Sequence, residues 1–187
     1  NCKVMSINGA IATYIAIEKY NPIAIINEGT AGSHSRNVHK GDIVVGENCI
    51  SIVSNQTPIK GEGEGSNSLE WNLTDFISGE ENRLIYRKAD SHLLKLAKEV
   101  EYLEGKVHFG TIGSGDVWNR EIDRIMMLHK KYDTLCEEME GISVYTVANN
   151  FNVPVIGIRI ISNNEILCES YERSTGRKSQ EFTYELI

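Results

Sequence analysis

Short, largely apolar segments alternate along the chain with longer segments whose apolar residues recur at helical spacing. Residues 23–26 are apolar at every position, residues 107–112 and 155–161 are largely apolar, and residues 43–53 are rich in β-branched side chains. Strands that are apolar at every position are typical of a sheet whose two faces are covered by helices. The pattern therefore predicts four strands of an α/β domain.

The segments between these strands predict four helices. Residues 7–20 place isoleucines and Tyr14 among alanines, and the Asn21-Pro22 pair ends that pattern. Asp90 is suited to cap a helix that runs to residue 100. Residues 118–130 and 138–150 each carry an apolar stripe at i, i+3 and i+4 spacing. This alternation indicates one domain with a largely parallel sheet flanked by helices.

Residues 54–79 interrupt the alternation. They contain Gly61, Gly63 and Gly65 and many polar residues around an isolated Trp71. We therefore expect a long ordered loop with little regular structure. The aromatic surface of Trp71 would be better buried, which favours placing this loop at an interface between subunits.

Composition and charge exclude several classes of function. The chain has 187 residues, of which 41% are hydrophobic, and a formal net charge of −7, as expected for one ordinary domain. Nucleic-acid binding needs a clustered positive field, but no basic run is longer than a pair such as Lys130-Lys131. The apolar segments fall far short of the ~20 residues that span a bilayer. We therefore expect neither nucleic acid nor a membrane as a partner.

The cysteines indicate a reducing compartment. They lie far apart, without a Cys-x-x-Cys pair or a Cys/His cluster at metal-ligand spacing, at Cys2, Cys49, Cys136 and Cys168. We interpret them as free thiols and expect no metal site. The chain begins at Asn1 without Met or a signal peptide, so we expect that an initial segment is missing.

Four segments at the ends of predicted strands or the start of a helix are candidates for a site, at residues 29–32, 113–118, 137–140 and 162–164. Ligands of open α/β sheets bind beyond the carboxyl ends of the strands. Each segment alone is also a common turn or helix start. Arg159 is a stronger signal, because a guanidinium inside an apolar strand needs a carboxylate or a ligand. Glu138 or Glu140 is suited to supply the carboxylate.

Five motifs in a fixed order are more informative than any one of them. They are Asn-Glu-Gly-Thr-Ala-Gly at 27–32, Lys-Gly-Asp-Ile-Val-Val at 40–45, Gly-Ser-Gly-Asp-Val-Trp at 113–118, Glu-Met-Glu at 138–140 and Arg-Ile-Ile-Ser-Asn at 159–163. Together they resemble the nucleoside phosphorylase and nucleosidase superfamily, and most closely its 5′-methylthioadenosine/S-adenosylhomocysteine nucleosidases. The resemblance runs from Val4 to Phe182 and is poor over residues 54–87. It implies a three-layer fold with a central mixed, largely parallel sheet over residues 1–187, without the N-terminal strand or strands.

The resemblance implies cleavage of the N-glycosidic bond of a purine ribonucleoside through an oxocarbenium-like ribose. Glu140 would hold the ribose hydroxyls, because a carboxylate accepts both O–H bonds and stabilises positive charge on the sugar. Met139 would pack against the ribose. Trp118 would stack on the purine, and the backbone of Asn119 would read the purine edge.

Further contacts implied by the resemblance surround these residues. Thr30 and Gly29 would line the side of the ribose that water or phosphate attacks. Ser162 would support the residue that follows it. Glu138 and Arg159 complete the substrate-binding residues that we expect.

Two departures from the family pattern bear on the chemistry. Where adenine-specific nucleosidases have an Asp that protonates purine N7, this chain has Asn163, which donates a hydrogen bond but transfers no proton. General acid catalysis is worth about 10²–10⁴ in rate. Related 6-oxopurine phosphorylases use Asn near this place, so adenine nucleosides are favoured but the base stays open. The second departure is that the acidic residue that orients the attacking water in the family would precede Asn1.

Asn27 bears on the choice between water and phosphate. Phosphorylases of the superfamily place an Arg at this position, two residues before the Gly-Ser/Thr pair. Without that cation a phosphate dianion loses a charge-assisted, bidentate partner, so water is favoured as the nucleophile. Arg36 or Arg87 is the candidate to replace the cation from a loop.

Three hypotheses follow. The first is a cytoplasmic, homodimeric purine nucleosidase of the methylthioadenosine/S-adenosylhomocysteine type, with Asn163 and Glu140 as catalytic residues and no metal or organic cofactor. The second is a phosphate-dependent purine nucleoside phosphorylase. The third is a nucleoside-binding protein with reduced catalysis.

Overall fold

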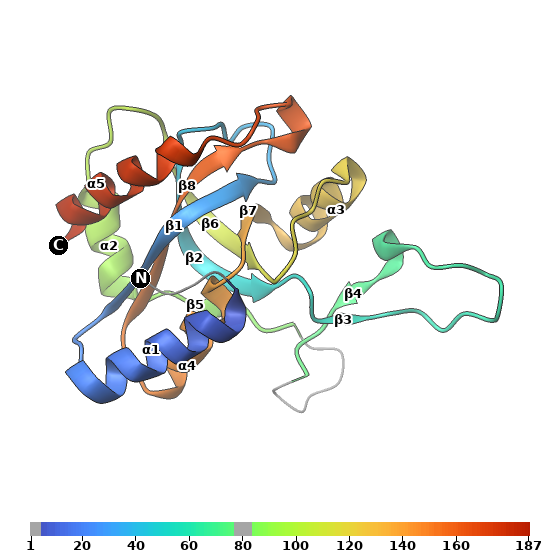
Figure 1. Cartoon of the computed structure of the whole chain (residues 1–187), viewed down its shortest axis with the longest axis horizontal. Helices are drawn as coiled ribbons and strands as arrows, with labels where there is room; N and C mark the ends of the chain where they lie inside the picture. The colour runs from blue at the N-terminus through green and yellow to red at the C-terminus, as the bar shows by residue number, and fades with distance from the viewer. Residues whose placement is uncertain (1–4, 77–83) are drawn as a thin grey trace.

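A six-stranded mixed sheet forms the centre of the computed structural model, which describes residues 5–76 and 84–187 (Figure 1). The strand order is β5-β2-β6-β7-β1-β8. The strands are β1 (Ile25–Ser33), β2 (Ile43–Ser51), β5 (Arg87–Lys88), β6 (Val107–Ser114), β7 (Thr134–Glu138) and β8 (Val155–Asn163).

Strand direction divides the sheet into two parallel groups. Strands β1 and β8 are parallel to each other, and β2, β6 and β7 are parallel to one another. The groups meet antiparallel at two places, β1 with β7 and β2 with β8. The sheet therefore closes on itself, and the expected mixed, largely parallel sheet is confirmed.

Helices cover the sheet on both sides. They are α1 (Ser6–Tyr20), α2 (Ser91–Glu99), α3 (Ile122–Tyr132), α4 (Gly141–Asn150) and α5 (Gly176–Leu186), with short 3₁₀ helices at Ser68–Glu70, Glu165–Leu167 and Arg173–Thr175. Helix α5 packs on β1 and β8, α2 on β2 and β8, and α4 on β2, β6 and β8. Helix α1 packs on α4, on the opposite side of the strands from α2 and α5 (Figure 1).

The helices predicted at residues 7–20 and 90–100 are confirmed. Helix α1 ends at Asn21, whose φ of 44° is left-handed. The Asp90 carboxylate caps α2 by accepting hydrogen bonds from the N–H groups of His92 and Leu93 at 2.9 and 3.0 Å.

Two predicted helices begin later than their patterns indicated. Helix α3 begins at residue 122 instead of 118, and α4 begins at 141 instead of 138. Contacts with distant residues hold the preceding segments, since Gly115 N–H donates to the Glu138 carbonyl and Asn119 N–H donates to the Glu137 side chain. Residues 134–138 form β7, which the pattern did not predict because the strand is short and largely polar.

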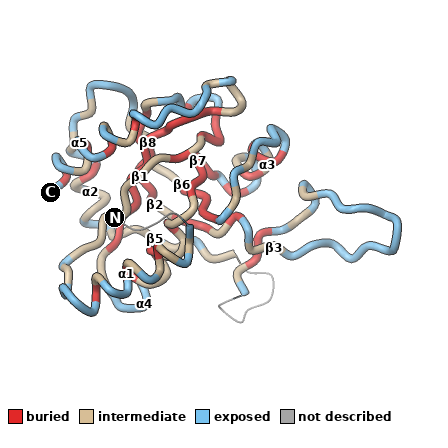
Figure 2. Tube along the Cα trace, in the orientation of Figure 1, coloured by how far each residue is buried: buried red, intermediate tan, exposed pale blue. Residues whose placement is uncertain are grey.

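Residues 55–73 form an arm that extends away from the body of the protein (Figure 1). Its only regular pairing among the described residues joins β3 (Asn55–Gln56) to β4 (Asn72–Leu73), which agrees with the expected shortage of regular structure. Most of the arm is exposed (Figure 2). Trp71 is half-buried, and the Arg124 guanidinium lies 5.9 Å from its ring centroid. The exposed surface of Trp71 is therefore smaller than expected, because its own chain covers part of the ring.

The buried residues gather between the sheet and its helices (Figure 2). Cys49 and Cys136 are buried free thiols and Cys168 is an exposed one, whereas Cys2 lies outside the described residues. Within residues 5–76 and 84–187, every helix is too short or too polar to cross a membrane.

Candidate functional site

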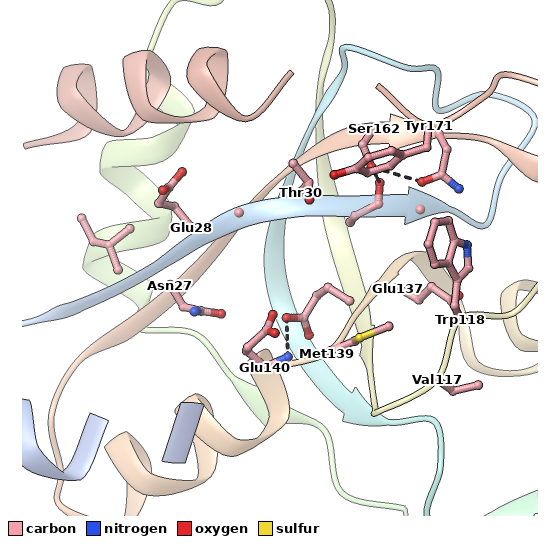
Figure 3. Close-up of a pocket in the computed structure, with 16 residues that line it drawn as sticks. Asn27, Glu28, Thr30, Val117, Trp118, Glu137, Met139, Glu140, Ser162 and Tyr171 are labelled. Carbon is pink, nitrogen blue, oxygen red and sulfur yellow. Dashed lines mark hydrogen bonds between the residues drawn. The ribbon is translucent and has the colours of Figure 1, made fainter. Parts of the chain in front are cut away.

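A cavity of about 520 Å³ lies where the ends of β1, β7 and β8 come together (Figure 3). Gly32 of β1 is in register with Glu137 of β7 on one side and with Asn163 of β8 on the other. The loop that follows β6 adds Val117 and Trp118 to the wall. The antiparallel junction of β1 and β7 therefore brings the carboxyl ends of oppositely running strands to one place.

Most of the residues predicted for the site line this cavity. They are Gly29, Thr30, Trp118, Glu138, Met139, Glu140, Ser162 and Asn163. Trp118 lies at one end and Glu140 lies away from it, with Met139 between them (Figure 3). The prediction that Trp118 and Glu140 share one cavity is confirmed.

Glu140 presents a carboxylate where β7 passes into α4. Its Oε1 accepts a hydrogen bond from the Met5 N–H at 2.8 Å. Burial raises the pKa of the Glu140 carboxyl and outweighs the Met5 hydrogen bond, and the nearby Glu138 charge adds to the increase. The cavity therefore contains a partly desolvated carboxylate that accepts hydrogen bonds.

Glu138 and Arg159 fix the corner on which Glu140 stands. Their side chains are 1–2% exposed and form an ion pair at 2.6 Å. Burial raises the pKa of Glu138, but the charge and hydrogen bond of Arg159 outweigh it and lower the pKa overall. The Glu138 carboxylate also accepts the N–H groups of Glu140 and Gly141 at 2.8–2.9 Å.

Arg159 does not line the cavity, so the expectation that it contacts substrate needs correction. Its guanidinium donates to the Asn27 carbonyl and side chain in addition to Glu138. The oxygens of Glu138 are likewise engaged by protein donors. Both residues are positioning residues, and they hold the backbone that presents Glu140.

The other end of the cavity is aromatic. Trp118 packs edge-on against Tyr171, with 6.0 Å between ring centroids. Asn163 is 4% exposed beside these rings. Its Oδ1 lies 3.1 Å from the Ser162 hydroxyl, and its Nδ2 donates to Glu165 at 3.4 Å. The predicted supporting contact of Ser162 with the residue after it is therefore present.

Asn119 is placed differently from the prediction. It is not among the lining residues, and its backbone N–H donates to Glu137 Oε1 at 2.7 Å. The Asn119 side-chain amide donates to the other oxygen of the same carboxylate. The backbone N–H of Asn119 is therefore already bonded within the protein, and the role of this backbone in reading a purine edge stays a prediction.

Sequence reasoning missed several lining residues. Glu137 belonged to the flagged segment 137–140, but nothing in the sequence distinguished it from the acidic residues that follow. Tyr171 gave no signal because it lies outside every motif. Glu28 lines the cavity with a buried Oε2 that has no hydrogen-bond partner among the described residues.

The candidate phosphate ligands lie elsewhere. Arg36 and Arg87 line other cavities, and Arg87 pairs with Asp75 at 3.1 Å. The described residues that line the site include no lysine or arginine. Asn27, at the position where a phosphorylase has Arg, is bonded to Arg159.

A closed mixed sheet, flanked by helices and carrying this cavity at its strand ends, defines the nucleoside phosphorylase-like class of α/β proteins. The chain belongs to the phosphorylase superfamily, whose family model matches residues 5–184.

Comparison with known proteins agrees with this membership. The chain is 30% identical over 166 residues to a 5′-methylthioadenosine/S-adenosylhomocysteine nucleosidase of Maridesulfovibrio salexigens, and the match covers 87% of this chain and 65% of that protein. The fold is shared with futalosine hydrolase of Helicobacter pylori, with a TM-score of 0.78, 21% identity, and coverage of 99% of this chain and 76% of that one. It is also shared with a 5′-methylthioadenosine/S-adenosylhomocysteine nucleosidase from S. pneumoniae, with a TM-score of 0.77, 21% identity, and coverage of 99% and 77%. The chain thus spans just under two thirds of the length of the first relative.

Proposed function

We propose that the protein is a purine nucleosidase, which hydrolyses the N-glycosidic bond of nucleosides of the 5′-methylthioadenosine/S-adenosylhomocysteine type. The observation that carries this proposal is a single cavity with the aromatic pair Trp118 and Tyr171 at one end and the Glu140 carboxylate toward the other. The similarity to a nucleosidase named for these two nucleosides supports it.

The arrangement suits an oxocarbenium-like transition state. The Glu140 carboxylate accepts the ribose hydroxyls and stabilises the positive charge that grows on the sugar. Trp118 and Tyr171 hold the flat base. The bond between C1′ and N9 breaks with its electron pair moving into the purine, and the water oxygen bonds to C1′. One proton of the water stays on the new ribose hydroxyl and the other ends on the purine.

Water is the nucleophile that the site supports. A phosphate dianion needs charge-assisted donors, and the described lining residues offer no lysine or arginine. The Arg159 guanidinium is held by Glu138 and Asn27. The similarity of the chain to a nucleosidase agrees with this choice.

The test is an assay of base release by the complete protein. The substrates are 5′-methylthioadenosine, S-adenosylhomocysteine, adenosine and inosine, each with and without phosphate. We expect base release that is independent of phosphate, with free ribose or its 5′ derivative as the second product. Turnover that depends on phosphate would instead identify a phosphorylase, and absence of base release from every substrate would reject the enzyme class.

A binding protein with reduced catalysis is the second candidate, and Asn163 favours it because an amide transfers no proton to a leaving base. Calorimetry distinguishes it from an enzyme, since it would show tight nucleoside binding without turnover. We further propose that the protein acts in the cytoplasm as a homodimer. The cytoplasmic location is tested by separating cytoplasmic and membrane fractions of cells and probing each for the protein, which we expect in the cytoplasmic fraction.

A further inference from the structure

A second cavity, of about 860 Å³, lies where α3, the loop that follows β1 and the arm come together. Helix α3 packs on β7 and on the arm residues Ser68–Glu70, so it stands between the sheet and the arm (Figure 1). The second cavity shares no lining residue with the candidate site, and the proposed nucleosidase reaction uses none of its residues. Its volume lies within the roughly 300–1,000 Å³ that small-molecule sites occupy.

Positive charge gathers around the second cavity. Three cations line it, Arg36, Lys130 and Lys131, against one carboxylate at Asp123, so its charged side chains carry a net charge of +2. The whole chain carries −7, and the described residues that line the candidate site include no lysine or arginine. The positive charge is therefore local, and it suits an anionic ligand.

These cations are available to a ligand. Within the part of the chain that the structure describes, Arg36 and Lys130 form no ion pair. Lys131 donates a hydrogen bond to the Asn72 side chain, which is neutral and leaves the charge of Lys131 uncompensated. A bound anion would therefore meet cations that pair with no carboxylate of the protein.

The loop that carries Arg36 is fixed by hydrogen bonds from buried residues. The carbonyl of the neighbouring residue Ser35 accepts the Ser33 hydroxyl at 3.0 Å and the Asn164 side chain at 2.9 Å. Asn164 is fully buried and also donates to the Val38 carbonyl at 3.0 Å. The backbone at Arg36 therefore needs little ordering when a ligand binds, which lowers the cost of binding.

Much of the remaining wall is apolar. Leu69 of the arm and Met126 of α3 are 39% and 43% exposed, and the half-buried Met127 and Ile166 line the same cavity. Apolar side chains that are exposed together mark binding surfaces, and methionine adapts to the shape of what it binds. Inorganic phosphate alone would leave these side chains uncovered, so the ligand should also have an apolar body.

The cations favour a phosphate group over a carboxylate. A guanidinium binds two oxygens of either anion, and lysine binds phosphate as a point charge. A phosphate monoester carries about −1.5 to −2 charges near neutral pH, which matches the net charge of +2 on the charged side chains. A carboxylate would compensate only about half of that charge.

We propose that the second cavity binds a small molecule in which a phosphate monoester is attached to an apolar body. Arg36 and the two lysines hold the phosphate, and Met126 packs against the body. The ligand lies next to the candidate site without entering it. His34 lines the second cavity, and its Nε2 lies 3.1 Å from the carboxylate of Glu137, which lines the candidate site.

Isothermal titration calorimetry of the complete protein tests the proposal, with 1-naphthyl phosphate as the probe. We expect saturable binding. 1-Naphthol lacks the anion and inorganic phosphate lacks the apolar body, so each should bind at least about tenfold more weakly, because a hydrogen bond to a charged group alone is worth about that factor. 1-Naphthoate, which carries a single charge, should also bind more weakly than the phosphate.

Variants locate the bound probe. Lys130→Gln should weaken binding about tenfold, and Arg36→Gln by at least as much, because the guanidinium contacts two oxygens. Lys95→Gln is the matched control, since it removes the same charge from an exposed position on α2 outside the second cavity. Trp118→Ala changes the candidate site. Both of these variants should bind the probe as the unmodified protein does.

Three results would overturn the proposal. The first is a lack of saturable binding at about 10 mM probe. The second is an equal affinity in Lys130→Gln and Lys95→Gln, or a loss of binding in Trp118→Ala, because either places the probe elsewhere. The third is binding of 1-naphthoate as tight as that of 1-naphthyl phosphate, which would remove the phosphate. None of these measurements uses base release, so the outcome is independent of the proposed nucleosidase.

Discussion

Glu140 shows how the surroundings of one residue prepare it for the proposed function. It follows β7 directly and precedes α4, so the backbone that carries it is fixed from both sides. The Glu138 carboxylate accepts its N–H at 2.9 Å. Burial removes water from the Glu140 side chain and raises its pKa, and in such surroundings a charge interacts more strongly than in water.

The pH dependence of base release is a prediction at this scale. In the proposed reaction Glu140 acts as a carboxylate, so activity should fall as the pH drops through its pKa. Because that pKa is raised, the acid limb of kcat/KM should lie above the ordinary glutamate value of about 4.3. Profiles of kcat/KM against pH for the unmodified protein and for Glu140→Gln measure the position of this limb. We expect the variant to lose about 10²–10³ in kcat and to lack this limb. An unchanged limb in the variant would assign it to another group.

At the scale of elements, the buried pair of Glu138 and Arg159 joins β7 to β8. Short sequence motifs indicated that Arg159 needs a carboxylate, and the structure selects Glu138 at 2.6 Å. Two charges that are almost fully buried depend on each other, because removal of one leaves the other without compensation. The pair therefore belongs to the stability of the sheet as well as to the position of Glu140.

Removal of Arg159 should be costly. We expect Arg159→Met to lower the free energy of unfolding by about 3–5 kcal/mol in urea titrations, because Glu138 is left buried and unpaired. Lys98→Met is the control, since it removes a surface pair with Glu47 at 4.0 Å and should cost at most about 1 kcal/mol. The double variant Glu138→Gln/Arg159→Met should recover part of the loss. Equal losses of stability in Arg159→Met and Lys98→Met would contradict the stabilising role of the buried pair.

The same pair should make stability sensitive to acid. The pKa of Glu138 is lowered in the folded protein, so its contribution is fully present above the unfolded value of about 4.3. It is lost as the pH falls through the lower folded value. Thermal unfolding between pH 7 and pH 3 should show this decrease, and the double variant should show less of it.

The elements also show what sequence patterns miss. Apolar periodicity located α1, α2, β2 and β8 closely. It failed for β7 because this strand carries polar residues that tertiary contacts satisfy, such as Thr134 and Glu137 with His34. It also extended α3 back to Trp118, since local propensity contains no information about the contact between Asn119 and Glu137.

At the scale of the whole molecule, the direction of the strands decides where the site lies. Because β1 and β8 run against β2, β6 and β7, carboxyl ends from both groups overlap at the β1–β7 junction. A fully parallel sheet would place these ends along one edge. The closed sheet instead brings residues from four strands, or from the loops that follow them, to the wall of one cavity.

The homodimer expected from the family resemblance is a prediction at this scale. Trp71 no longer supports it, because Arg124 lies over the ring. Light scattering coupled to size-exclusion chromatography of the complete protein measures the mass of the particle. We expect twice the mass of one chain over a range of concentrations, and a particle with the mass of a single chain would remove the expectation.

The sequence by itself determined the α/β class, most helices and the motifs from which the site is built, because burial patterns and residue types are local properties. It also indicated that Trp118, Glu140 and Asn163 act together. Only the tertiary structure decided that Arg159 is an internal support, that the Asn119 backbone N–H is bonded to Glu137, and that Glu137 lies in the wall of the cavity. These outcomes depend on which donors and acceptors meet across strands, and pairing between distant residues leaves no trace in the spacing along a single chain.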